Sequence, residues 1–243
     1  MIKLAVSDVD GTLVPESMSG VTDDVVGIIE KIINKGITFA FSSGRTYGEL
    51  TEMFQTLIDK VYFTCCDGAL TVKNGKVLYS RKIEQEDLES FFKHKDSGFS
   101  FILHGAFENY GFGELPDEAK RFNCKPVQSV FDVKDKVYKI TSYGQIFPYT
   151  NSGLRMHWDG IGITQYVNRY CNKGVALSDL QMRLALTKYD TAVFVDSGND
   201  ICMVKGAKIS YCIENKCEEL VNICSERFES GKDALDDFFD LIC

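Results

Sequence analysis

Short apolar runs alternate along this chain with longer segments whose apolar residues recur every three or four positions. The short runs lie at residues 2–6, 37–41, 61–64, 191–195 and 208–213. The longer segments lie at residues 22–35, 50–57, 173–184 and 233–242. In the first of these, Val25, Ile28, Ile29 and Ile32 share one helical face, and Thr22 can cap its start. The pattern predicts strands at the runs and amphipathic helices at the longer segments.

The alternation of these elements favours an α/β fold with a doubly wound parallel sheet. Strands covered by helices on both faces are apolar over most of their length, as these runs are. Ligands of such sheets bind beyond the carboxyl ends of the strands. Polar residues that directly follow a run are therefore the first candidates for chemistry.

The middle of the chain has a different pattern. Residues 71–78 form a predicted hairpin around Asn74-Gly75, and a helix is expected over 85–95. Alternating, strand-like stretches follow at residues 99–104, 137–142, 154–158 and 162–166. We expect an inserted α+β module at residues 81–167 and an α/β core at residues 1–80 and 168–243.

Composition narrows the class of protein. The net charge of −8 opposes non-specific binding to nucleic acid. No apolar stretch approaches the roughly 20 residues of a membrane span, and no signal peptide is recognisable. We expect a soluble, cytoplasmic protein, monomeric or homodimeric, with no nucleic-acid or membrane partner. The nine cysteines show no zinc-ligand spacing and are interpreted as reduced thiols.

Two carboxylates follow the first apolar run, in Asp8-Val9-Asp10-Gly11-Thr12. Like charges held close together raise each other's pKa, so a nearby positive charge is needed to keep both ionised. A hard divalent cation with oxygen ligands is the natural candidate. The motif predicts a metal-assisted site, although Asp and Gly are also common in plain turns.

Three further motifs lie where strands end or helices begin. Ser43-Gly44-Arg45 offers a hydroxyl and backbone amides suited to a phosphate oxygen, or a simple helix cap. Lys173 starts a helix, an unfavourable place for a cation unless an anion is near. Asp196 and Asp200 follow the run 191–195 and are able to bind metal or to cap a turn.

These four motifs, in this order, resemble those of the haloacid dehalogenase-like hydrolases. The similarity is greatest to the Cof-type branch, in which a C2-type cap lies between the second and third motifs. The resemblance implies a Rossmann-like core with an inserted cap. It also implies a Mg²⁺-dependent phosphatase that acts on small phosphate esters, particularly sugar phosphates.

The resemblance also assigns roles to the carboxylates. Asp8 would attack phosphorus and form an aspartyl-phosphate, and Asp10 would protonate the leaving oxygen and then activate water. Mg²⁺ would be held by Asp8, Asp196 and the main-chain carbonyl of Asp10, and Asp200 would orient its waters.

The same resemblance assigns phosphate binding to Ser43, Gly44, Lys173 and Asn199. The chain departs from the family pattern at two places. Val195 stands where the family usually has glycine, and Asp67 stands where it often has asparagine, which adds an acid near the site or caps a turn.

The inserted module is less informative about the substrate. Arg155, His157 and Trp158 lie on an alternating segment that is able to face the site and select the leaving group, or to be ordinary strand residues. Two other functions stay open. A phosphomutase would pass the phosphoryl group to a sugar hydroxyl, and a metabolite-binding protein would keep the fold without turnover.

Overall fold

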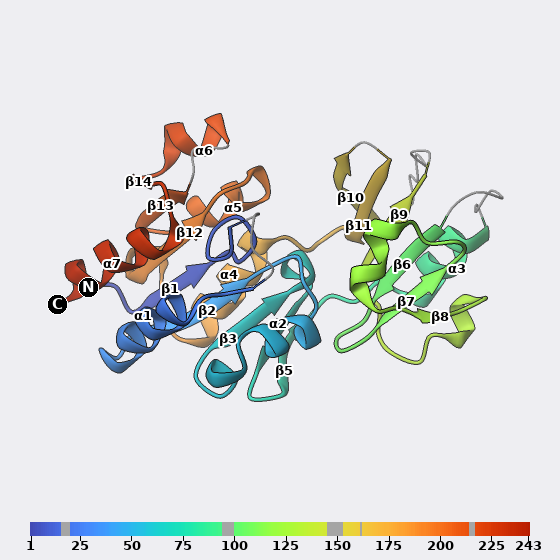
Figure 1. Cartoon of the computed structure of the whole chain (residues 1–243), viewed down its shortest axis with the longest axis horizontal. Coiled ribbons are helices and arrows are strands. Elements are labelled where there is room, and N and C mark those ends of the chain that lie inside the picture. The colour runs from blue at the N-terminus through green and yellow to red at the C-terminus, as the bar shows by residue number, and fades with distance from the viewer. Residues whose placement is uncertain (16–19, 94–99, 145–152, 161, 214–216) are drawn as a thin grey trace.

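The computed structural model describes residues 1–15, 20–93, 100–144, 153–160, 162–213 and 217–243. The strands form two sheets, which occupy the two halves of the molecule in Figure 1. The core sheet contains β1 (Leu4–Ser7), β2 (Thr38–Ser42), β3 (Tyr62–Cys65), β4 (Leu70–Lys73), β5 (Lys76–Ser80), β12 (Thr191–Val195), β13 (Ile209–Ile213) and β14 (Glu226–Phe228). The module sheet contains β6 (Ser100–His104), β7 (Asn109–Phe112), β8 (Lys125–Pro126), β9 (Lys139–Tyr143), β10 (Leu154–Gly160) and β11 (Ile163–Asn168).

Seven α-helices lie in the described residues. They are α1 (Asp23–Asn34), α2 (Tyr47–Met53), α3 (Gln85–Lys93), α4 (Lys173–Arg183), α5 (Ile201–Val204), α6 (Glu218–Ile223) and α7 (Gly231–Ile242). No helix in this part of the chain has the length and apolar character that a membrane crossing requires.

The core sheet has helices on both faces, as predicted. Its order is β14-β13-β12-β1-β2-β3-β4-β5, and the first six strands are parallel while β4 and β5 form an antiparallel hairpin. In the central strand β1, Ala5 packs in the same apolar cluster as α1 and α7, whereas Leu4 and Val6 pack with α4. Burial on both faces explains why these strands are mostly apolar.

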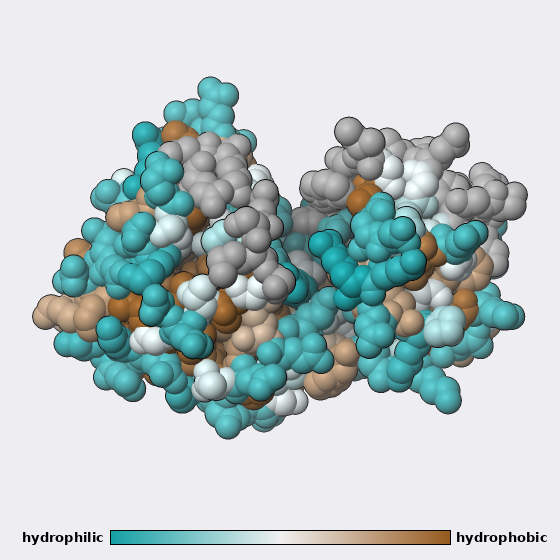
Figure 2. All heavy atoms as spheres, viewed as in Figure 1, coloured by the Kyte–Doolittle hydropathy of each residue, from teal (hydrophilic) through white to brown (hydrophobic). Residues whose placement is uncertain are grey.

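The module sheet has the order β10-β11-β9-β6-β7-β8 and is antiparallel except for the β7–β8 pair. Helix α3 covers one face with Leu88, Phe91 and Phe92, which pack against strand residues such as Phe101 and Ile140. The α/β fold class with an inserted α+β module is therefore confirmed. We keep 80/81 and 167/168 as proposed boundaries between the two parts. In the space-filling view the surface is mostly hydrophilic, and a notch separates the two parts (Figure 2).

The differences from prediction are local. The turn after Ser43 does not lead straight into a helix, because α2 begins at Tyr47 and Thr46 is its cap. The predicted hairpin is present, and both Asn74 and Gly75 adopt the positive φ that its tight turn requires. The pattern missed β7, β8, α5, α6 and β14, which are short elements of two to six residues.

Candidate active site

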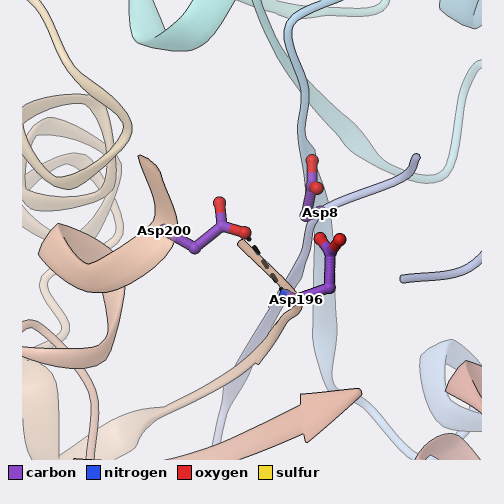
Figure 3. Close-up of side chains that lie close together, drawn as sticks. All are labelled: Asp8, Asp196 and Asp200. Atoms are coloured by element: carbon purple, nitrogen blue, oxygen red, sulfur yellow. Dashed lines mark hydrogen bonds between the residues drawn. The ribbon is translucent and has the colours of Figure 1, made fainter. Parts of the chain in front are cut away.

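Two adjacent strand ends bring the first and fourth motifs together. Strands β1 and β12 pair in parallel with Ser7 opposite Phe194, and the Asp8 amide donates to the Phe194 carbonyl oxygen at 3.0 Å. Asp8 and Asp196 therefore leave neighbouring strands at the same edge of the sheet. Figure 3 shows their carboxyl groups close together, with Asp200 beside them.

The turn after Asp8 is shaped to fit against Asp196. Gly11 has φ +86°, and a Cβ built on it would lie 2.2 Å from a carboxylate oxygen of Asp196. A side chain at this position would meet both backbone strain and a clash, so glycine is required. Thr12 then donates from its hydroxyl to Asp196 Oδ1 at 3.0 Å. The Gly-Thr pair thus positions a carboxylate that lies 184 residues further along the chain.

Lys173 is the cation at the centre of this cluster. Its Nζ donates to Asp8 Oδ1 at 2.8 Å and to Asp200 Oδ1 at 2.7 Å, and only 1% of the residue is exposed. Lys173 is the first residue of α4, whose N-cap is Asn172. The two carboxylates offset the unfavourable placement of a cation at a helix N-terminus.

The carboxylates outnumber the cation. One oxygen from each of Asp8, Asp196 and Asp200 lies within 4.8 Å of the others, and all three residues are buried. Burial raises the pKa of Asp8 well above its ordinary value, despite the opposing effect of Lys173. Burial also raises the pKa of Asp196, and the nearby Asp200 adds to that increase. Three carboxylates against one ammonium leave an excess of negative charge in a buried space.

The second motif forms the next wall of the site. Ser43 is fully buried, and its Oγ accepts from the Arg45 amide at 3.1 Å. The Arg45 guanidinium donates to both carboxylate oxygens of Asp10, at distances from 2.6 to 3.1 Å. The Asp10 side chain is 48% exposed, and its carboxylate is not part of the three-carboxylate cluster.

The departure at Asp67 has a partner in the module. Lys139 of β9 donates to Asp67 Oδ2 at 3.2 Å and to the Gly44 carbonyl oxygen at 2.5 Å. The side chains of Lys139 and Asp67 are 6% and 3% exposed. The acid at position 67 is therefore one half of a buried ion pair that joins the module to the turn after β3, and the bond from Lys139 to Gly44 joins the module to the loop after Ser43.

Lys139→Met is expected to lower the free energy of unfolding by about 3 kcal/mol, because it removes the cation beside a buried carboxylate. The double variant with Asp67→Asn should recover most of this loss, since the buried charge is then gone. Denaturant unfolding measures both, with the exposed Lys136→Met as the matched control. Equal losses in the single and double variants would contradict the pairing.

The site opens into a cavity of about 560 Å³ between the core and the module. Asp8, Asp10, Gly44, Lys173 and Asn199 line it from the core. Its module wall consists of Arg121, Phe122, Lys139, Thr141, Tyr143, Ile163 and Gln165.

The module residues proposed from the sequence lie elsewhere or are not described. The Arg155 guanidinium donates to the Cys171 carbonyl oxygen at 2.7 Å, and Arg155 is not among the described residues that line the cavity. The side chains of His157 and Trp158 lie outside the described part of the structure. The module wall was missed because its residues come from separate strands and from the 3-10 helix η3 (Asp117–Phe122).

The chain is similar to known proteins over nearly its whole length. A family model described as haloacid dehalogenase-like hydrolase matches residues 5–234. A relative from Escherichia coli K12, named 5-amino-6-(5-phospho-D-ribitylamino)uracil phosphatase YbjI, is 21% identical over 99% of this chain and 95% of its own length.

Solved structures share the fold. SMU.1108c from Streptococcus mutans superposes with a TM-score of 0.85 at 22% identity, over 99% of this chain and all of that one. A structure titled as the subclass IIB sugar phosphatase BT4131 has a TM-score of 0.78 at 19% identity, over 99% of this chain and all of that one. At these identities the likeness shows the fold alone.

Proposed function

The chain belongs to the haloacid dehalogenase-like hydrolases and is a phosphatase, and we propose that it hydrolyses small sugar phosphates with Mg²⁺ through an aspartyl-phosphate. The observation that carries this proposal is the buried cluster of Asp8, Asp196, Asp200 and Lys173 at the end of the cavity. The similar proteins include a ribitylaminouracil phosphatase and a sugar phosphatase, which supports an ester of a hydroxylated small molecule as the substrate.

The donor set fits a magnesium ion. Mg²⁺ prefers oxygen ligands and commonly takes one or two carboxylates together with waters. Asp8 and Asp196 would hold it with the Asp10 main-chain carbonyl, and Asp200 would hold its waters. When bound, the ion supplies positive charge that keeps the buried carboxylates ionised and polarises the phosphoryl oxygens.

Residues of this chain carry out the attack on phosphorus, the proton transfers and the binding of the phosphoryl oxygens. An Asp8 carboxylate oxygen forms the new bond to phosphorus as the bond from phosphorus to the leaving oxygen breaks. Asp10 gives a proton to that leaving oxygen. It later takes a proton from a water whose oxygen bonds to phosphorus as the bond from phosphorus to Asp8 breaks, which releases inorganic phosphate and restores the Asp8 carboxylate. For this, Asp10 must turn from Arg45, which its half-exposed position allows. Lys173, Ser43, Gly44 and Asn199 stabilise the phosphoryl oxygens.

Without metal, Asp196→Asn is expected to raise the free energy of unfolding at neutral pH by about 1 kcal/mol, or roughly 2–4 °C in Tm. The pKa of Asp196 is higher in the folded state than in the unfolded state, so its ionisation opposes folding. This penalty is absent below the unfolded pKa of about 4, grows as pH rises from there to the folded pKa, and is constant above it.

Thermal unfolding in EDTA and in Mg²⁺, at pH 5 and 7.5, measures this effect. Mg²⁺ should stabilise the wild type more than Asp196→Asn, because the variant lacks one charged ligand. A wild-type Tm that is the same with and without Mg²⁺ would contradict the metal assignment. A lower Tm for the variant than for the wild type in EDTA would contradict it as well.

The function itself is tested with a panel of sugar phosphates, nucleotides and p-nitrophenyl phosphate, with and without Mg²⁺. We expect release of inorganic phosphate that requires Mg²⁺ and is fastest with a sugar phosphate. Isomerised sugar phosphate without free phosphate would instead indicate a mutase. Binding without any turnover across the panel would indicate a non-catalytic protein.

A further inference from the structure

A chain of hydrogen bonds runs inward from the module wall of the cavity. Thr141, His104 and Asn109 lie on three neighbouring strands, β9, β6 and β7, in the order in which those strands pair. Thr141 Oγ1 lies 2.8 Å from His104 Nε2, and His104 Nδ1 lies 2.8 Å from Asn109 Oδ1. The Asn109 amide nitrogen completes the chain by donating to the Phe122 carbonyl oxygen at 3.1 Å.

The far end of this chain determines the direction of every bond in it. A carbonyl oxygen only accepts, so the Asn109 NH₂ group must face Phe122 and its Oδ1 must face His104. Because Oδ1 also only accepts, His104 Nδ1 must carry a proton and donate it. The Asn109 amide thereby selects the Nδ1–H tautomer of His104.

The other nitrogen of His104 is consequently an acceptor. His104 is 2% exposed, and burial together with the nearby Lys139 cation lowers its pKa to about 3. The ring is therefore neutral at physiological pH, and Nε2 holds a lone pair. The Thr141 hydroxyl must donate its only proton to Nε2. Towards the cavity, Thr141 Oγ1 then offers lone pairs and no donor.

We propose that Thr141 is a specificity residue which selects phosphate esters whose leaving group carries a hydrogen-bond donor, a hydroxyl or an N–H, and that His104 and Asn109 are positioning residues that hold it in this acceptor state. Thr141 lines the same cavity as Asp8, on the module side, where the leaving group of an ester attacked by Asp8 extends. This inference rests on the proposed phosphatase function and refines its substrate class.

A hydrogen-bond acceptor at Thr141 discriminates between leaving groups of similar size. A hydroxyl on the leaving group can donate to Thr141, whereas fluorine in its place keeps a similar size and cannot donate. A fluorinated analogue leaves the buried Oγ1 facing a second electronegative atom. Discrimination against fluorine therefore reports a donor requirement and not a size requirement.

The test compares the best hydroxylated substrate of the panel with its deoxyfluoro analogues, fluorinated one position at a time. We expect one position at which fluorine lowers kcat/KM about tenfold in the wild type. This ratio should fall to within about twofold in Thr141→Val, which is similar in volume but has no hydroxyl, and should persist in Thr141→Ser. A best substrate without any donor, or an unchanged ratio in Thr141→Val, overturns the proposal.

A second measurement does not depend on turnover. The ¹⁵N chemical shifts of His104 should show the neutral Nδ1–H tautomer in the full chain at pH 7, assigned by loss of the signal in His104→Gln. The Nε2–H tautomer or a charged ring would overturn the inference. Failure of the phosphatase function is distinguished by a wild type that releases no phosphate from any ester, p-nitrophenyl phosphate included.

Discussion

Asp8→Asn is expected to lower phosphate-ester hydrolysis by about four orders of magnitude while the protein stays folded. An amide oxygen is a poor nucleophile towards phosphorus, so the proposed covalent step is lost. The change keeps the shape of the side chain, and the amide oxygen can still accept from Lys173 Nζ, which lies 2.8 Å from Asp8 Oδ1. Because burial raises the pKa of Asp8, the neutral side chain should also not reduce stability in the absence of metal.

Initial rates with Mg²⁺ and thermal unfolding in EDTA measure the two halves of this prediction. Asp24→Asn is the matched control, because Asp24 is an exposed acid in the first turn of α1. Mass spectrometry of rapidly quenched enzyme should detect a phosphorylated chain in the wild type and none in Asp8→Asn. Wild-type activity in the variant would exclude Asp8 as the nucleophile.

Much of the fold could be predicted because the core strands are covered on both faces. Runs 37–41 and 191–195 are apolar except for Thr38 and Thr191, and this pattern depends only on local sequence. The short edge strand β14 (Glu226–Phe228) carries no such pattern, because Glu226 and Arg227 are exposed and only Phe228 is partly buried. Its position is determined by pairing with β13, and the local sequence pattern does not indicate this pairing.

Some residues of the site could likewise be predicted from local sequence, and others could not. Asp8 and Asp196 could be proposed because each directly follows an apolar run, and parallel pairing of those runs brings the two carboxyl groups together. Lys139 and Thr141 could not be proposed, because their roles depend on contacts with residues far away in the sequence. Lys139 contacts Asp67, 72 residues away, and Thr141 contacts His104, 37 residues away. In a strand of alternating residues, both look like ordinary positions on one face.

The contacts of Arg45 show a further limit of interpreting motifs from the sequence alone. The second motif was interpreted through its hydroxyl and amides, but the structure also pairs the Arg45 guanidinium with Asp10. The resemblance gave Asp10 a role in proton transfer and nothing in the sequence supplied it with a partner. Only the approach of the β1 and β2 ends shows that the two motifs share a charge pair.

Lys173→Met is expected to lower kcat/KM by two to three orders of magnitude, because it removes a buried positive charge that we propose faces the phosphoryl group. The same change should lower the free energy of unfolding in EDTA by about 3 kcal/mol. Lys173 is the cation hydrogen-bonded to both Asp8 and Asp200, and its removal leaves three buried carboxylates together. The pKa of Lys173 is raised, since these carboxylates outweigh the effect of burial, so the side chain is charged at every pH of the assay.

Mg²⁺ separates the two effects of this substitution. A divalent ion at the carboxylates should restore much of the lost stability, since it replaces the missing positive charge. It should not restore activity, because the group that we propose contacts the phosphoryl oxygens is still absent. Denaturant unfolding with and without Mg²⁺, alongside kinetics, measures both, with the exposed Lys205→Met as control. Activity that recovers together with stability would mean that Lys173 only compensates charge, and that Ser43, Gly44 and Asn199 suffice to hold the phosphoryl group.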